Sequence, residues 1–129
     1  MRPPRHHRPM RILIVEDDDA SLYLAKRVAE HMGHTVLSAS DGVQALATAR
    51  SERLDLLLLD LRMPGISGLQ VVRELRADPS LRTLPVIAVS ADASTDDREA
   101  AMSAGCDDFV AKPYQPEELR AAIRRRLRM

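Results

Sequence analysis

Short apolar runs of strand length alternate with segments of helical periodicity along this chain of 129 residues. The apolar runs span residues 12–15, 35–37, 54–59, 86–89 and 109–111, and helical patterns follow them at 22–32, 41–50, 69–79, 96–105 and 116–127. A repeated strand–helix order predicts a parallel sheet, and runs with few polar residues predict that helices cover both of its faces. The expected fold class is therefore α/β, with a five-stranded parallel sheet in the middle of three layers.

Polar side chains follow four of the five predicted strands. Glu16 and Asp17 follow the first, Asp60 the third, Ser90 the fourth and Lys112 the fifth. Sheets of this kind bind ligands outside the carboxyl ends of their strands. We therefore expect three carboxylates, one hydroxyl and one ammonium group to converge at one edge of the sheet.

This combination of groups predicts phosphoryl-transfer chemistry. Carboxylates held close together repel one another unless a cation joins them, and Mg²⁺ suits a site of few carboxylates, waters and phosphate oxygens. Lys112 and Ser90 would each offer a donor to a phosphoryl oxygen, and Asp60 would serve as a nucleophile that forms an acyl phosphate. Lys112 is informative because this chain is rich in arginine, and a compact ammonium fits a single phosphoryl oxygen better than a planar guanidinium does.

Composition excludes several other functions. All 19 acidic residues lie between Glu16 and Glu118, and aromatic residues make up 2% of the chain, which argues against a nucleic-acid surface. No apolar run reaches the ~20 residues of a membrane span. The single cysteine, Cys106, excludes an internal disulfide and favours a cytoplasmic location. Residues 1–10, rich in proline and arginine, are expected to be a disordered basic tail, and residues 11–129 to form one domain.

Four segments in this order resemble one known family. They are Ile-Leu-Ile-Val-Glu-Asp-Asp-Asp at 12–19, Leu-Leu-Leu-Asp-Leu-Arg-Met-Pro-Gly at 57–65, Val-Ile-Ala-Val-Ser-Ala at 86–91 and Asp-Asp-Phe-Val-Ala-Lys-Pro at 107–113. Together they resemble the receiver domain of two-component response regulators, over about residues 10–127. The resemblance implies a flavodoxin-like (βα)5 fold with strand order 2-1-3-4-5. It also implies a phosphorylation-dependent switch rather than a turnover enzyme, with a sensor histidine kinase or a histidine phosphotransfer protein as phosphodonor.

The resemblance assigns roles to the acidic residues and to one backbone group. Asp60 matches the phosphoacceptor, and Asp17 matches a direct Mg²⁺ ligand. Glu16 matches the acid that holds a metal-bound water, and the backbone carbonyl of Arg62 matches a further ligand. Asp18 or Asp19 is left as the N-terminal cap of the first helix.

The resemblance also assigns a switch. Ser90 matches the hydroxyl residue that turns toward the phosphoryl group, and Lys112 matches the lysine that pairs with it. Phe109 matches the aromatic switch residue, although it is equally well read as a core residue. The Lys112–Pro113 peptide matches one that is typically cis. Output is expected through protein contacts made by the last helix–strand–helix face.

Two other functions, a phosphatase and a flavin-binding module, are alternatives to this assignment. An aspartate-nucleophile phosphatase would need a second aspartate two residues after Asp60, where the chain has Arg62. A flavin-binding module would need a loop rich in serine and threonine after the first strand.

The resemblance also suggests a hypothesis on dephosphorylation. In receivers, the residues two after the phosphoacceptor and two after the hydroxyl residue border the path of the hydrolytic water. Here they are Arg62 and Asp92, which we expect to pair and to slow dephosphorylation.

Overall fold

The computed structural model describes residues 9–91 and 94–127 and confirms the predicted alternation. The strands are β1 (Arg11–Val15), β2 (Thr35–Ala39), β3 (Leu56–Asp60), β4 (Val86–Ser90) and β5 (Asp108–Ala111). The helices are α1 (Asp19–His31), α2 (Gly42–Ser51), α3 (Gly68–Ala77), α4 (Thr95–Ala104) and α5 (Pro116–Leu127). All neighbouring strands pair in parallel, in the order β2-β1-β3-β4-β5, as expected for the flavodoxin-like fold.

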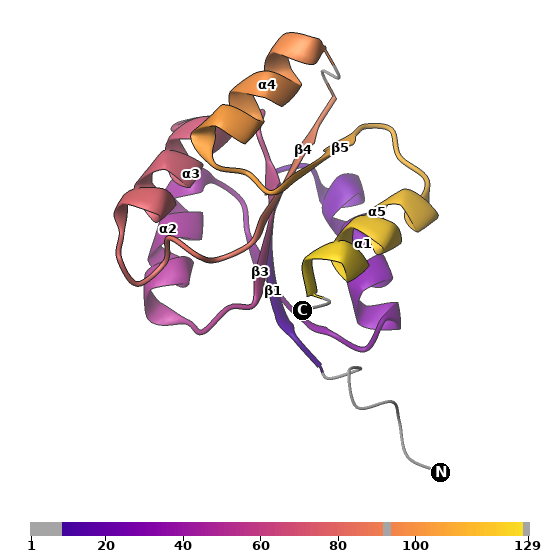
Figure 1. Ribbon diagram of the computed structural model, residues 1–129. Helices are drawn as coiled ribbons and strands as arrows, with labels where there is room; N and C mark the ends of the chain where they lie inside the picture. The colour runs from indigo at the N-terminus through magenta and orange to yellow at the C-terminus, as the bar shows by residue number, and fades with distance from the viewer. Residues whose placement is uncertain (1–8, 92–93, 128–129) are drawn as a thin grey trace.

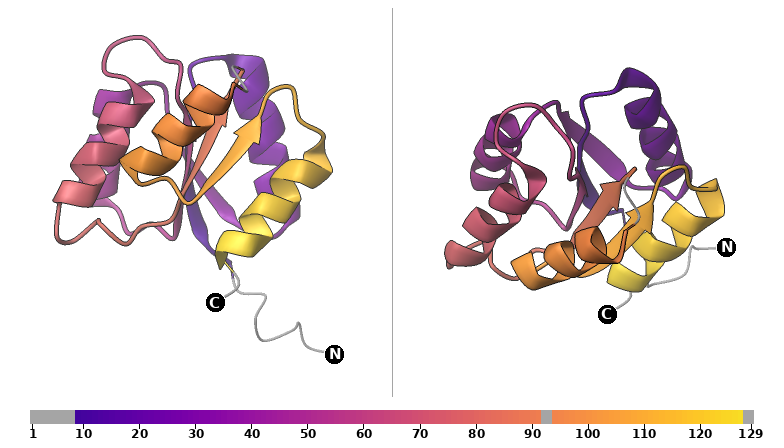
Figure 2. Two further views of the ribbon diagram at one scale, coloured as in Figure 1. Left: turned by 45° about the horizontal axis from the view of Figure 1, so that its top comes forward. Right: turned by 90° about the horizontal axis from the view of Figure 1, so that it is seen from above.

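The sheet is the middle layer between two groups of helices. Helices α1 and α5 cover one face, and α2, α3 and α4 cover the other (Figures 1 and 2). Alternate side chains of each strand enter opposite cores because successive residues point to opposite faces. In β3, for example, Leu57 and Leu59 pack beneath α2 and α3, whereas Leu58 packs with Leu119 and Ile123 of α5.

Side-chain caps define where the helices begin. Asp18, one of the two predicted candidates, accepts a hydrogen bond from a backbone N–H of the first turn of α1, and Asp41 does the same for α2. Ser67 and Ser94 cap α3 and α4 in the same way, and neither was recognised from the sequence. Each cap satisfies one N–H group that the helix itself leaves without a partner.

The predicted tail, residues 1–10, lies outside the described residues except for Pro9 and Met10. Met10 is joined to the sheet: its N–H donates to His34 Nδ1 at 3.1 Å, and its carbonyl accepts from the Thr35 N–H at 2.8 Å. Among the described residues, no helix is both long enough and apolar enough to cross a membrane.

Candidate functional site

Strand register brings the predicted polar residues to one edge of the sheet. Val15 pairs with Leu59, so Glu16 and Asp60 follow at the same level on neighbouring strands. Ser90 is the last residue of β4, and its carbonyl accepts from the Lys112 N–H at 2.8 Å. The predicted meeting of these strand ends at one edge is therefore confirmed, while a role for the Ser90 hydroxyl there remains a prediction.

The acidic residues form a cluster with the geometry of a cation site. Glu16, Asp17 and Asp60 each offer a carboxylate oxygen, and these atoms all lie within 4.8 Å of one another. Glu16 and Asp60 are 7% and 6% exposed, whereas Asp17 lies at the surface. A set of oxygen ligands with one open side fits a hard divalent cation.

Lys112 reaches across this cluster. Its Nζ donates to Glu16 Oε1 at 2.7 Å and to Asp60 Oδ2 at 3.2 Å. Burial lowers the pKa of the Lys112 ammonium, but the bonds to these two carboxylates outweigh it, so that pKa lies above its ordinary value. Lys112 is thus a fixed positive charge beside the carboxylate of Asp60. The Lys112–Pro113 peptide is cis, as the resemblance implies.

The surroundings of Glu16 disfavour the charged form of its carboxyl group. Burial raises the pKa of its carboxyl group, and this effect exceeds the opposing effect of the Lys112 bond. The Asp18 N–H also donates to Glu16 Oε2, at 3.2 Å, and fixes the side chain toward the cluster. A bound cation would offset the energetic cost of burying this charge.

Glu16→Gln is expected to stabilise the cation-free protein at pH 7. A carboxyl group whose pKa is raised by folding binds more protons in the folded than in the unfolded state, so stability falls as pH rises between the two values. Removing the charge removes that loss, and the gain should disappear as pH falls below the ordinary value of 4.5. Thermal unfolding between pH 4 and 7, with chelator present, measures this.

The matched control is Glu30→Gln, at an exposed position of α1, which should change little at any pH. A loss of stability for Glu16→Gln at pH 7 would contradict the prediction and show that the bond to Lys112 outweighs burial.

The beginning of α3 packs closely against the backbone at the end of β3. A Cβ atom at Gly68, the first residue of α3, would lie 2.7 Å from Leu61 Cα and 3.1 Å from the Asp60 carbonyl oxygen. Only glycine therefore lets α3 begin this close to the strand that carries Asp60. The sequence analysis did not single out Gly68.

Arg62 contacts Asp60 through its backbone. Its N–H donates to Asp60 Oδ1 at 2.9 Å, while its side-chain Nη2 donates to Asp97 Oδ2, on α4, at 2.6 Å. The pairing of Arg62 with Asp92 remains a prediction, because Asp92 lies outside the described residues. The Arg62–Asp97 contact was not predicted, and a separation of 35 residues leaves no local signal for it.

The two predicted switch residues are both buried. Ser90 is 0% exposed, and Phe109 is 5% exposed within the core on the α2–α3–α4 side of the sheet. The guanidinium carbon of Arg98, on α4, lies 4.7 Å from the centre of the Phe109 ring, a cation–π contact that was not predicted. Phe109 is therefore a core residue, and its switching role remains a prediction.

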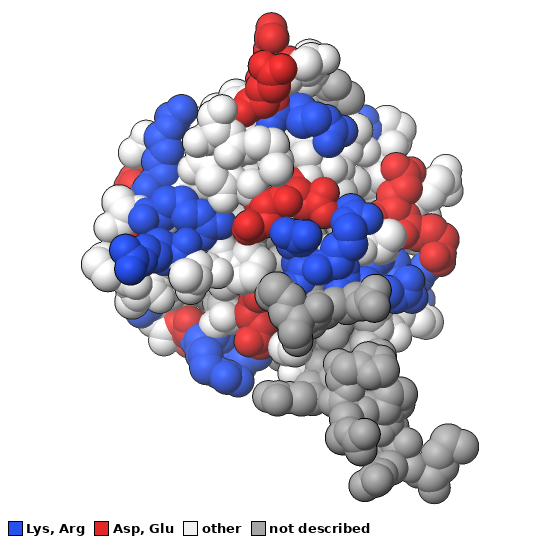
Figure 3. All heavy atoms as spheres, viewed as in Figure 1, with Lys and Arg blue, Asp and Glu red and all other residues white. Residues whose placement is uncertain are grey.

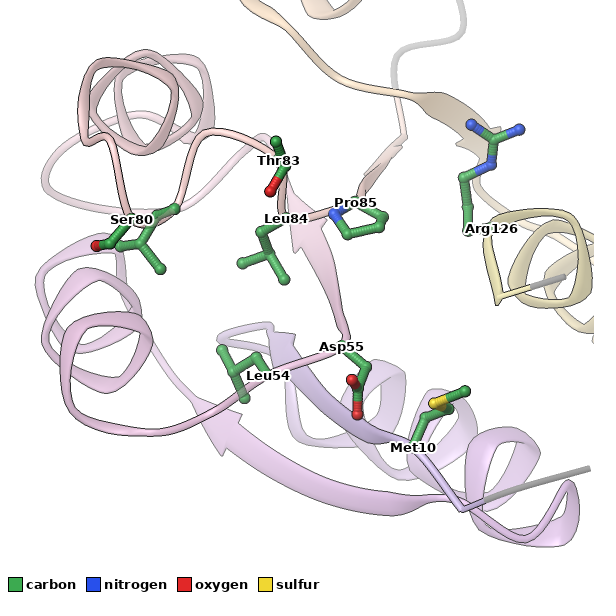
Figure 4. A pocket seen from close by; sticks show the side chains of 9 residues that line it. Met10, Leu54, Asp55, Ser80, Thr83, Leu84, Pro85 and Arg126 are labelled. Carbon is green, nitrogen blue, oxygen red and sulfur yellow. The ribbon is translucent and has the colours of Figure 1, made fainter. Parts of the chain in front are cut away.

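One hollow of the molecule lies away from this cluster. It measures about 450 Å³ and is lined by Met10, Leu54, Asp55, Ser80, Leu81, Thr83, Leu84, Pro85 and Arg126 (Figure 4). Several of these residues directly precede a strand, so the hollow lies at the amino ends of the strands, opposite the carboxylates. The hollow is therefore separate from the carboxylate cluster.

Comparisons with known proteins agree with the geometry. A family profile described as response regulator receiver domain matches residues 12–124. Response regulator MprA of Mycobacterium ulcerans is 42% identical over 119 residues, which are 92% of this chain and 50% of MprA. DNA-binding response regulator MtrA of Mycobacterium tuberculosis is 40% identical over 118 residues, again 92% of this chain and 50% of MtrA. The chain spans about half the length of these curated relatives.

Solved structures extend the likeness to the fold. The receiver domain of sensor histidine kinase PA1611 from Pseudomonas aeruginosa has a TM-score of 0.87 at 34% identity, and the match covers 95% of this chain and 100% of that one. That crystal structure holds a magnesium ion in its active-site cleft. The receiver domain of a histidine kinase from Syntrophus aciditrophicus has a TM-score of 0.85 at 31% identity, covering 92% and 90%. With the predicted fold and a family match over most of its length, this chain belongs to the response regulator receiver domains of two-component systems.

Proposed function

We propose that this receiver domain is switched by phosphorylation of Asp60 and relays the signal through protein contacts. The observation that supports this most directly is the position of Lys112, whose Nζ bridges Glu16 and Asp60. An ammonium beside a buried carboxylate can stabilise the charge of an incoming phosphoryl group. Receiver domains are signalling domains and not turnover enzymes, so the phosphorylated state itself is the product.

The proposed transfer forms an acyl phosphate. A carboxylate oxygen of Asp60 attacks the phosphorus of a phosphohistidine, the phosphorus–nitrogen bond breaks, and its electron pair leaves with the imidazole, which takes up a proton. Lys112 and the Ser90 hydroxyl are proposed to donate to the phosphoryl oxygens. The Arg62 N–H, 2.9 Å from Asp60 Oδ1, holds the carboxylate in place.

The residues present fit a Mg²⁺ ion. Asp17 and Asp60 would be direct ligands with the Arg62 carbonyl, and Glu16 would hold a metal-bound water, in keeping with the oxygen-only cluster. When bound there, Mg²⁺ supplies positive charge that offsets the carboxylates and lets an anionic donor approach. The exposed position of Asp17 leaves the cluster open to solvent on one side.

The proposed partners are a sensor histidine kinase or a histidine phosphotransfer protein as donor, and a protein target at the face formed by α4, β5 and α5. Met102 of α4 is a large apolar residue that is 45% exposed. Arg125 of α5 pairs with Asp108 of β5 at 2.8 Å, and Figure 3 shows basic side chains gathered over α5 with acidic ones beside them. We propose no nucleic-acid or membrane contact for this domain, and a cytoplasmic location, which would keep the free Cys106 reduced.

Asp60 is expected to gain one phosphoryl group from acetyl phosphate, and only when Mg²⁺ is present. The carboxylate cluster repels an anionic donor until a cation offsets its charge. Intact-mass spectrometry follows the added mass in Mg²⁺ and in chelator. Asp60→Asn should remain unlabelled under both conditions.

The matched control is Asp55→Asn, because Asp55 directly precedes β3 at the opposite edge of the sheet. This variant should be labelled like the wild type. Equal labelling of Asp60→Asn, or full labelling in chelator, would contradict the assignment. Repeated turnover of a small phosphate ester would favour the phosphatase reading.

A further inference from the structure

Two adjacent residues of helix α4 contact two different neighbouring elements. Asp97 Oδ2 accepts from Arg62 Nη2 at 2.6 Å, which links α4 to the loop after β3. Arg98 lies over the ring of Phe109, which links α4 to β5. In Figure 3 the beginning of α4, at the top of the view, shows acidic side chains with basic atoms beside them. The beginning of α4 therefore contacts both the loop that follows the phosphoacceptor strand β3 and strand β5, which β4 separates from β3.

Arg62 is the one residue in this linkage that also contacts Asp60. Its N–H donates to Asp60 Oδ1 at 2.9 Å, so its side chain starts beside the carboxylate that would carry the phosphoryl group. The side chains of Arg62 and Asp97 are 59% and 26% exposed. An ion pair in such contact with solvent is held weakly, and a stronger anion nearby can displace the carboxylate.

A phosphoryl group on Asp60 would be that stronger anion. It carries about two negative charges near neutral pH and three acceptor oxygens. A planar guanidinium binds such oxygens in pairs, with more charge assistance than a single carboxylate provides. The Asp97 carboxylate and the phosphoryl group on Asp60 would therefore compete for the guanidinium of Arg62.

We propose that Arg62 changes partner on phosphorylation, from Asp97 to the phosphoryl oxygens on Asp60. Asp97 is then a positioning residue: it holds Arg62 away from the site in the unphosphorylated protein and loses that contact in the phosphorylated one. The exchange frees the first turn of α4 from the loop after β3, while the contact of Arg98 with Phe109 is untouched. This proposal rests on Asp60 being the phosphoacceptor.

The test is the affinity for beryllofluoride in saturating Mg²⁺, a non-hydrolysable mimic of the phosphoryl group, measured by ¹⁵N NMR titration. Asp97→Asn should bind it about two- to fivefold more tightly than the wild type, because Arg62 no longer has to leave the Asp97 carboxylate. In an Arg62→Met background, adding Asp97→Asn should change the affinity by less than about 1.5-fold, because coupled neighbours are not additive.

Two further variants separate partner exchange from simpler effects. Asp96→Asn removes the neighbouring acidic residue of the same helix turn and should leave the affinity unchanged, which excludes a general loss of negative charge. Asp97→Glu restores the charge and should return the affinity toward that of the wild type. Mg²⁺ affinity and thermal unfolding of each variant are measured first, so that binding is compared between folded, metal-loaded proteins.

The outcomes distinguish this inference from the proposed function. Unchanged or weaker binding by Asp97→Asn, an equal gain in Asp96→Asn, or a gain that persists without Arg62 would overturn partner exchange. A wild-type protein that binds no beryllofluoride, or an Asp60→Asn variant that binds it normally, would instead overturn the proposed function.

Discussion

Lys112→Met is expected to slow the phosphorylation of Asp60 by acetyl phosphate by about 10²-fold, at saturating Mg²⁺. The Lys112 ammonium lies 3.2 Å from Asp60 Oδ2 before any donor arrives, so its charge is already beside the carboxylate that is phosphorylated. Removing one such preorganised donor typically costs about 10²–10³ in rate. Intact-mass time courses measure the effect.

The same substitution should strengthen Mg²⁺ binding, because the metal no longer competes with an ammonium for Glu16 and Asp60. Slower transfer together with tighter metal binding cannot arise from unfolding. Lys112→Arg should recover only part of the rate, since a planar guanidinium does not place its charge at one point. Lys26→Met, which changes the other lysine of the chain at an exposed position of α1, is the control. A rate equal to wild type for Lys112→Met would remove Lys112 from the mechanism.

The strand ends made this site predictable. In a parallel sheet the carboxyl ends of neighbouring strands meet at one edge, so residues far apart in sequence are brought together by topology alone. Glu16 and Lys112 are 96 residues apart and still form a bond of 2.7 Å. The periodicity of apolar residues was sufficient to predict that these side chains converge, because Glu16, Asp60, Ser90 and Lys112 each directly follow, or end, a buried strand. The bond between Glu16 and Lys112 itself was not predicted.

Contacts between the loops and helices were not predictable in the same way. Arg62 with Asp97, and Arg98 with Phe109, join residues whose separation and relative rotation depend on how α4 packs. No periodic pattern encodes that rotation for an exposed arginine. The caps at Ser67 and Ser94 had a local signal, a serine just before a helical pattern, but serine is also common in turns.

Arg76 is another residue whose contacts had no signal in the sequence. Its substitution should be the most destabilising single change outside the apolar core. Its guanidinium, at the end of α3, donates to the carbonyls of Gly105, Arg82 and Leu84 and to Asp107 Oδ2, at 2.7 to 3.1 Å. One side chain thus joins the loop after α3 to the loop after α4. Arg76→Met is expected to lower the free energy of unfolding by about 2–4 kcal/mol, since it leaves partly buried carbonyls without donors.

The effect of Arg76→Met should pass beyond the lost bonds. Asp107 Oδ2 also accepts from the Val86 N–H at 2.8 Å, so the start of β4 loses a partner held in place by the arginine. Urea unfolding at fixed Mg²⁺ measures the change. Arg76→Lys should recover less than half of it, because one ammonium cannot reach carbonyls on two loops that a planar fork spans. Arg73→Met, at an exposed position of the same helix, should change stability by less than about 0.5 kcal/mol. If Arg76→Met is equally mild, then water replaces the guanidinium at these carbonyls, and the two loops are held by the packing of Leu75 and Leu84 beneath them.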